Sequence, residues 1–291
     1  MTKSPAPANV YDKQYSIFGV NDADVVWRYL TLSKFLDLLK TSALFFSCTN
    51  RISDDWEGTM SDEAARWLDD WFRKAKQAAK SSDPNFEVFK IASTYSEYFK
   101  KVVVRRSFAS CWHRKNAESS LMWCAYGGST DESVAIKTTI GRLRSCFDGK
   151  ALVQEYPDVS AQLFFGNVAY RDPRTTDCNM ALDNPEIIPF LVKRPEFCDE
   201  HEFRILIFES ELVVPYSSEL ANANLLDCPA GFHLEIDLHS LIDAVVVAPN
   251  AKEAFLEMVQ TEVKLHSQSR PTEKERRQIP IERSALTPTR R

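Results

Sequence analysis

The stretch from Phe197 to Phe208 constrains the fold of this chain most, because its character changes halfway through. Its second half is an apolar run of strand length, rich in branched and aromatic residues, which predicts a buried strand. Its first half is charged. Since side chains alternate between the faces of a strand, Glu200, Glu202 and Arg204 are expected on one face. This pattern fits either a solvated strand entrance or a polar site in which Arg204 holds one carboxylate.

The length of 291 residues allows one large or two ordinary domains with a sizeable core. The formal net charge of −5 gives no overall attraction to nucleic acid or anionic membranes, so a nucleic-acid partner would need a local patch. The N-terminus has no apolar export segment, and no stretch is long and apolar enough to span a bilayer. We therefore expect a cytoplasmic protein with no membrane partner.

A metal centre is not expected from the sequence. The seven cysteines are irregularly spaced, without a zinc or thioredoxin-like pair, so reduced and mostly buried thiols are the expectation. The five histidines form no ligand pair on one helix or strand face.

The first folding unit is predicted as a strand, a short helix and a second strand. Residues 25–30 alternate as a strand, with Arg28 as a charge in its middle and Tyr29 on the other face. Thr31 is placed as the N-cap of a helix, and residues 43–49 form the second strand, whose exit turns polar at Ser47 and Thr49. The unit therefore places polar groups at comparable positions on two strands.

Further strands are predicted at residues 108–112, 133–137, 163–170, 233–237 and 243–247, and helices at 119–126 and 251–266. Two long aromatic helices are expected between residues 61 and 104. We predict a flexible arm (1–22), a single α+β domain (23–286) with a helical insertion (61–104), and a basic tail end (287–291). The expected fold is α+β, with a mixed, mainly antiparallel split sheet and flanking helices.

Several short pieces of the chain, in this order, resemble a bacterial family known as domain of unknown function 2971. The pieces are Trp27-Arg28-Tyr29, Leu44–Ser47, Asp54–Glu57, Ser110–Trp112, Met122–Tyr126, Val168–Tyr170, Lys193, Glu200–Arg204 and Glu282–Leu286. Two positions depart from the family pattern: Asp55 stands where Pro is usual, and Ser133 where Gly is common.

The layout also resembles that of NAD-dependent ADP-ribosyltransferases. Arg28 on the first strand, Ser47 to Thr49 on the second, and Glu200-His201-Glu202 late in the chain take the places of that motif set. The resemblance implies an ADP-ribosyltransferase-like fold with NAD as co-substrate and no metal. It also implies transfer of ADP-ribose or NAD hydrolysis, in a defence or toxin-like effector of bacteria.

The resemblance implies a role for each candidate. Glu202 would oppose the positive charge that grows on the ribose, and Glu200 would orient or deprotonate the acceptor. Arg28 would bind phosphate or the adenosine ribose. The remaining candidates are Ser47 and Thr49 as braces of Glu202, Trp112, Trp123 and Tyr126 as stacking residues, and Tyr29 and Arg204 beside the cofactor.

Each role has a structural alternative. Arg28 could pair with an acidic residue across the sheet, and Ser47 and Thr49 are ordinary residues for a strand exit. Core packing is the better expectation for Trp123 and Tyr126, because they lie three apart on a helix.

Two other functions compete with the enzyme. One is a noncatalytic module on the same scaffold that binds a nucleotide or a protein, and the other is a metal-dependent nuclease built on Glu200 and Glu202. Arg204 on the same face argues against the nuclease, because it competes with a cation. For the enzyme, the expected partners are a protein or nucleic-acid acceptor and an inhibitory partner protein.

Overall fold

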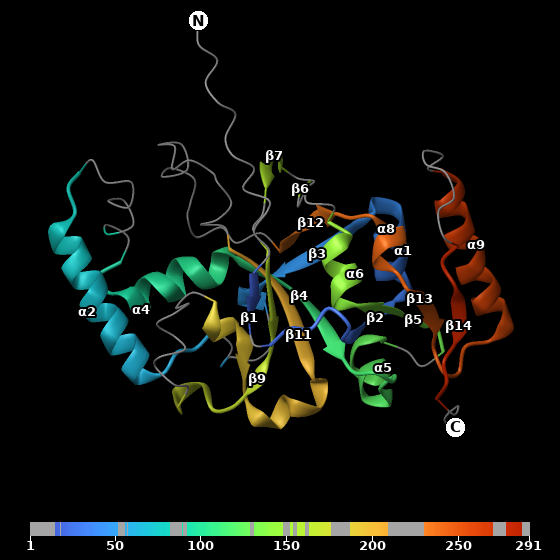
Figure 1. The fold of residues 1–291 in the computed structure, drawn as a ribbon, viewed down its shortest axis with the longest axis horizontal. Coiled ribbons are helices and arrows are strands. Elements are labelled where there is room, and N and C mark those ends of the chain that lie inside the picture. The colour runs from blue at the N-terminus through green and yellow to red at the C-terminus, as the bar shows by residue number, and fades with distance from the viewer. Residues whose placement is uncertain are drawn as a thin grey trace, which may run out of the picture.

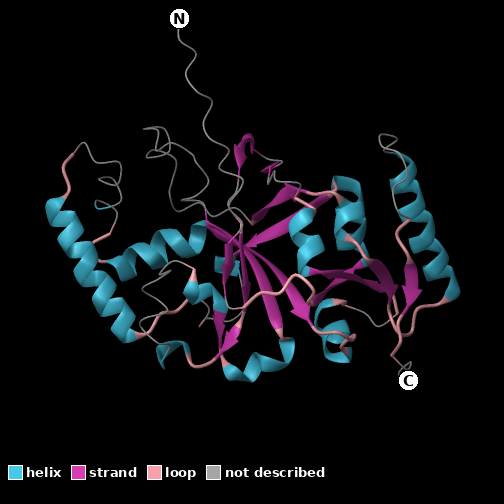
Figure 2. Cartoon of the chain, in the orientation of Figure 1, coloured by secondary structure: helices cyan, strands magenta, loops and turns pink. Residues whose placement is uncertain are grey.

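The computed structural model describes residues 15–17, 19–51, 56, 58–81, 89, 92–128, 131–147, 152–153, 156–160, 163–175, 187–208, 230–269 and 278–286. They form a mixed α+β structure in which helices surround a large, mainly antiparallel sheet (Figures 1 and 2). This confirms the predicted α+β class and the mainly antiparallel sheet.

The large sheet contains β1 (Tyr15–Ile17), β2 (Val25–Thr31), β3 (Ala43–Cys48), β4 (Ser107–Arg114), β5 (Ser133–Thr139), β6 (Leu152–Val153), β7 (Tyr156–Ser160), β8 (Phe164–Asn167), β11 (Glu202–Phe208), β12 (Gly231–Glu235), β13 (Ala244–Val247) and β14 (Ile281–Arg283). A small parallel sheet pairs β9 (Ala169–Tyr170) with β10 (Val192–Lys193). The helices are α1 (Leu32–Thr41), α2 (Asp62–Ala78), α4 (Tyr95–Tyr98), α5 (Ser120–Tyr126), α6 (Ile140–Ser145), α8 (Leu238–Leu241) and α9 (Glu253–Ser269).

The predicted unit of strand, helix and strand is present as β2, α1 and β3. The side chain of Thr31 caps α1 by accepting a hydrogen bond from the backbone N–H of Lys34 at 3.4 Å. The helix ends at Ser42, whose left-handed backbone (φ 50°) turns the chain directly into β3. The N-cap predicted at Thr31 is therefore confirmed, and the end of α1 is set by the left-handed backbone at Ser42.

The large sheet divides along β4. On one side β4 pairs with β11 from Ser107 to His113 without a gap. On its other side, β3 pairs only with Phe108 and Ala109, and β2 pairs only with His113 and Arg114. In the part of the chain that the structure describes, residues 110–112 have no strand partner on that side. From this split, β2 leads to β5, β13 and β14, and β3 leads to β12, β6 and β7.

The helical insertion lies at the end of the molecule opposite α9 (Figure 1). It begins with α2, as predicted. The second predicted helix is confirmed only in its later part: residues 92–94 are not helical, and from Tyr95 the chain continues as α4, a π-helix over 99–103 and a 3₁₀ helix over 104–106. A second apolar cluster forms there, where Phe72, Tyr95 and Phe99 pack with Phe190. Of the aromatics predicted for this segment, Phe86 lies outside the described residues.

The strand predicted in the stretch 197–208, with Glu200 expected on its face, begins at Glu202. Residues 195–200 instead form a 3₁₀ turn, and His201 has a left-handed backbone (φ 41°) that redirects the chain into β11. Glu200 is therefore not on the strand face that carries Glu202, and this part of the prediction is wrong.

Both ends of the chain contribute strands. Within the segment predicted as an arm, β1 pairs in parallel with β8. Near the other end, β14 pairs in parallel with β13 at the edge of the large sheet. Residues 1–14, residues 52–55 and the tail end at 287–291 lie outside the described residues.

Among the cysteines that the structure describes, four are free, and of these Cys146 is buried whereas Cys111, Cys124 and Cys198 are exposed. Cys48 is disulfide-bonded. The expectation of reduced thiols is therefore confirmed for these four and wrong for Cys48, and the expectation that the thiols are mostly buried is wrong.

Among the described helices, none is both long enough and apolar enough to cross a membrane.

Candidate active site

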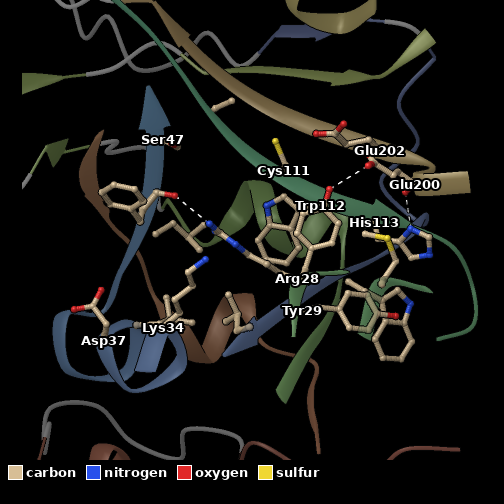
Figure 3. Close-up of a pocket in the computed structure, with 18 of the residues that line it drawn as sticks. Arg28, Tyr29, Lys34, Asp37, Ser47, Cys111, Trp112, His113, Glu200 and Glu202 are labelled. Atoms are coloured by element: carbon tan, nitrogen blue, oxygen red, sulfur yellow. Dashed lines mark hydrogen bonds between the residues drawn. The ribbon is translucent and has the colours of Figure 1, made fainter. Parts of the chain in front are cut away.

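A cavity of about 520 Å³ opens where the sheet divides (Figure 3). Its walls come from β2, β3, β4, β12, α1, α5, the start of β11 and the turn before it. The lining includes Trp27, Arg28, Tyr29, Lys34, Asp37, Phe45, Ser47, Cys111, Trp112, His113, Met122, Tyr126, Glu200, Glu202 and His233. Its volume lies in the range of small-molecule sites.

Glu202 lies at the start of β11 and is 7% exposed. Arg204, which is fully buried, donates from Nε to Oε1 and from Nη2 to Oε2 of Glu202, both at 2.8 Å. The backbone N–H of Glu202 donates to the hydroxyl of Tyr170 at 2.6 Å. Backbone and carboxylate are thus both fixed, as a preorganised site requires.

The environment keeps Glu202 ionised. Burial alone would raise the pKa of this carboxyl, but the charge and hydrogen bonds of Arg204, with the charge of Lys193, outweigh it. The pKa of Glu202 therefore lies well below its usual value.

Glu200 joins the same cavity from the 3₁₀ turn. Its Oε2 accepts from Nζ of Lys193 at 2.6 Å, and its Oε1 accepts from the hydroxyl of Tyr126 at 3.1 Å. The Lys193 ammonium also reaches Oε2 of Glu202 at 3.4 Å, and lies 4.7 Å from the ring centroid of Phe197. Lys193, 6% exposed, thus links the two carboxylates although they belong to different elements.

Arg28 spans the split in the sheet. Its Nη1 donates to Oγ of Ser110 on β4 at 2.9 Å, and its Nη2 donates to the carbonyl of Phe45 on β3 at 3.1 Å. The guanidinium carbon lies 5.6 Å from the ring centroid of Trp112. Burial lowers the pKa of Arg28 to about 10, which leaves it charged at neutral pH. The acidic partner that the structural alternative required is not among these contacts.

The three predicted stacking residues lie in different surroundings. Trp112 and Tyr126 line the cavity, whereas Trp123 is fully buried and donates from Nε1 to Glu118 at 3.0 Å. Tyr29 also lines the cavity, and its hydroxyl accepts from the N–H of Ser119, the N-cap of α5, at 2.9 Å. Trp112, Tyr126 and Tyr29 can therefore contact a ligand, and Trp123 supports the wall behind Tyr29.

The two polar residues predicted at the exit of β3 lie in different surroundings. Ser47 lines the cavity, but Thr49 begins a 3₁₀ turn and donates its hydroxyl to the carbonyl of Val104 at 2.7 Å. The predicted bracing of Glu202 is provided by Arg204, Lys193 and Tyr170 instead. Arg204 lies behind Glu202 and is not part of the lining.

Sequence reasoning missed several residues of the lining. His113 and Cys111 come from β4, Lys34 and Asp37 from α1, and His233 from β12. The alternation along β4 could have placed Cys111 and His113 on one face, but not against Glu202, because the pairing of β4 with β11 joins segments far apart in sequence. Within the described ranges, no cluster of three or more acidic, His or Cys side chains could hold a metal ion.

No protein-family model matches the chain, and no curated protein matches it in sequence. Among solved structures, DarT from Thermus sp. 2.9 in complex with ADP-ribosylated ssDNA is similar over 92% of this chain and 95% of that chain. The sequence identity is 8% and the TM-score 0.35. A likeness this distant carries no argument about fold or function, so the functional reasoning depends on the site alone. The resemblance to domain of unknown function 2971 stays a prediction.

Proposed function

We propose that this chain is an ADP-ribosyltransferase-like enzyme that cleaves NAD and passes ADP-ribose to an acceptor or to water. One observation carries the proposal: a buried, ionised carboxylate, Glu202, shares a cavity in the split sheet with the guanidinium of Arg28. A fixed negative charge and an anion-binding group are what the cleavage of a cationic nucleotide glycoside requires.

In the proposed reaction the bond between the ribose C1′ and the nicotinamide nitrogen breaks. The bonding electrons leave with nicotinamide, whose ring becomes neutral, and positive charge develops on the ribose. Glu202 opposes that charge and accepts a hydrogen bond from a ribose hydroxyl. Arg204 donates to both oxygens and Lys193 also donates to Oε2, so we expect the ribose hydroxyl to bond to Oε1.

Arg28 provides the anion-binding side of the site. Its guanidinium carries five N–H donors, and the hydrogen bonds to Ser110 and Phe45 account for two of them. The others are available to a diphosphate, for which the planar group is well suited. The aromatic face of Trp112 keeps the guanidinium in place.

Glu200 is assigned to the acceptor. It is less buried than Glu202, with 17% of its side chain exposed against 8%. Tyr126 and Lys193 fix its two oxygens, so an acceptor group would meet an oriented carboxylate. A hydroxyl, an amine or a water molecule would lose its proton to this side of the cavity as it attacks C1′.

A second candidate, a noncatalytic binding module, is favoured by the charge balance of the site. Both oxygens of Glu202 are held by cations, Arg204 on both and Lys193 on one. A carboxylate compensated in this way also suits a purely structural role. In that case NAD or a related nucleotide would bind and remain intact.

The test uses purified protein with NAD labelled on the adenylate, in bacterial lysate and in buffer. Free nicotinamide reports cleavage, and the fate of the label separates transfer from hydrolysis. Glu202→Gln is compared with Glu235→Gln, a carboxylate exposed on β12. Circular dichroism establishes that both variants are folded.

We expect nicotinamide release by the wild type and by Glu235→Gln, and its loss in Glu202→Gln. Full turnover by folded Glu202→Gln would refute the role of this carboxylate. Binding of NAD without cleavage by the wild type would favour the binding module. The label also identifies the acceptor class, so protein or nucleic-acid transfer becomes visible directly.

The inhibitory partner and the defence role are parts of the proposal that come from the resemblance alone, and the cytoplasmic location comes from the sequence alone. Expression in bacteria tests the toxic part, since growth arrest that depends on Glu202 is expected of an active effector.

A further inference from the structure

His113 has an unusual hydrogen-bonding state. It lies on β4, directly opposite Glu202 in the pairing with β11, and is 1% exposed. Its Nδ1 lies 2.6 Å from the carbonyl oxygen of Glu200. Its Nε2 is buried and has no hydrogen-bond partner in the part of the chain that the structure describes. Buried polar atoms are seldom left in this state unless a ligand or water completes them.

The chemistry of that contact determines the tautomer. A carbonyl oxygen only accepts, so Nδ1 carries the proton and donates it to Glu200. Burial lowers the pKa of His113, which favours the neutral ring. Nε2 therefore presents a lone pair and is a hydrogen-bond acceptor without a donor.

The surroundings of His113 indicate what kind of group would supply the donor. His113 lines the cavity together with Tyr29, Met122 and Tyr126, and the ring centroid of Tyr29 is 6.1 Å from that of His113. Figure 3 shows His113 on the Tyr29 side of the cavity, across from Ser47. A flat ring suits such an aromatic wall, and an N–H on its edge would satisfy Nε2.

We propose that His113 is a specificity-determining residue whose Nε2 accepts a hydrogen bond from an amide N–H on a planar aromatic ring of the ligand. The assignment rests on the proposed function, under which that amide is the carboxamide of the nicotinamide ring.

Such an acceptor would discriminate between NAD and its acid analogue, nicotinic acid adenine dinucleotide. The carboxamide offers N–H donors, whereas the carboxylate of the analogue has only acceptor lone pairs at neutral pH. Two facing acceptors cannot bond, and both are then left unsatisfied. Sites built around a hydrogen bond reject analogues that cannot make it.

Two substitutions separate this role from a structural one. His113→Asn keeps an amide N–H near the position of Nδ1, and can still bond the carbonyl of Glu200, but has no atom at the position of Nε2. His113→Gln places an amide oxygen near the position of Nε2, but loses the bond to Glu200. A purely structural role would be better preserved in His113→Asn, and an acceptor role in His113→Gln.

The experiment measures kcat/KM for NAD and for the acid analogue, by release of nicotinamide and of nicotinic acid, in wild type and both variants. The two leaving groups differ in the same way for every variant, so this difference cancels when the ratios are compared. We expect the preference for NAD to fall by about tenfold or more in His113→Asn, the size of one hydrogen bond to a buried group, and to persist in His113→Gln.

A wild-type ratio in folded His113→Asn would overturn the assignment, as would equal losses on both substrates in both variants. Calorimetric titration of the wild type with NAD separates the two proposals. If NAD is bound and cleaved but the substitutions leave the ratio of the two kcat/KM values unchanged, the role of His113 is refuted and the proposed function is not. Failure to bind NAD at all sinks the proposed function and this assignment with it.

Discussion

Replacing Arg204 by Met tests how the site keeps a buried carboxylate charged. Met has a similar length and no charge, so the change removes both hydrogen bonds to Glu202 and the bond from Nη1 to the carbonyl of Phe190 at 2.7 Å. Lys193, at 3.4 Å, would be the nearest remaining cation. Breaking a buried pair from one side costs about 3–5 kcal/mol, and the orphaned carbonyl adds ~1 kcal/mol or more. The loss approaches the whole stability of a marginal domain.

The pH dependence of this loss has a defined sign. In the wild type the pKa of Glu202 in the folded state is below its value of about 4.5 in the unfolded chain. That contribution to stability is present above the unfolded pKa, and is lost as the pH falls toward the folded one. In Arg204→Met, burial dominates and the folded pKa lies above the unfolded value. The destabilisation is then largest at neutral pH and becomes smaller as the pH falls toward 5.

Urea unfolding followed by circular dichroism at pH 7.5 and pH 5.5 measures both effects. Glu202→Gln and the double variant complete a cycle, in which the double variant should be more stable than Arg204→Met alone. The expected coupling between the two positions is on the order of 2 kcal/mol. A loss below about 1 kcal/mol in Arg204→Met, or strictly additive single changes, would show that Arg204 does not hold this carboxylate.

Three further predictions each concern a substitution of one residue. Arg28→Met should lower the free energy of unfolding by about 1–3 kcal/mol, through the two bonds across the split, and weaken NAD binding at least tenfold in calorimetric titration; unchanged affinity would contradict its role. Gly231→Ala places Cβ 2.1 Å from the carbonyl oxygen of Phe46, so a destabilisation of at least ~1–3 kcal/mol is expected in urea unfolding. Tyr126→Phe removes the hydroxyl bound to Glu200, and should change stability by less than ~1 kcal/mol while shifting the ratio of transferred to hydrolysed label. An unaltered ratio would remove Glu200 from the acceptor side.

The parts of the fold that the sequence predicts are those with local signals. The alternation of residues 25–30, the cap at Thr31 and the polar exit at Ser47 are each legible within ten residues, and β2, α1 and β3 follow them closely. The same holds for α5, which begins after Ser119 and ends at Gly127. Arg28 could be recognised for a related reason, since a charge inside an apolar strand needs an explanation.

The remainder depends on pairings between distant segments. Glu200 reads as a strand residue because it stands two positions before Glu202, but Pro195 and the left-handed backbone at His201 place it on a turn. Lys193 meets both carboxylates because β10 pairs with β9, and Tyr170 at the end of β9 also reaches Glu202. The hydrophobic periodicity of a single segment does not predict such contacts with distant segments.

The local sequence of β4 also gives no sign that one of its edges pairs with two different strands, β3 and β2. Its sequence alternates like that of any buried strand, yet its edge between Ala109 and His113 lies open in the split. Arg28 occupies that opening, because it is the side chain of β2 that can reach both β4 and β3. The feature that makes the cavity is therefore a property of the sheet and not of any one strand.

The balance of charge around the cavity separates the competing functions. The carboxylates of Glu200 and Glu202 are matched by Lys193 and Arg204, each within hydrogen-bonding or ion-pair distance. A metal-dependent nuclease would need these carboxylates for its cation, and would first have to displace two buried cations whose removal exposes uncompensated charge. Arg28 then remains as net positive charge facing the cavity, which favours an anionic ligand such as a dinucleotide diphosphate. The same balance leaves Glu202 ionised but screened, so its effect on a ribose cation depends on contact at one oxygen more than on a long-range field.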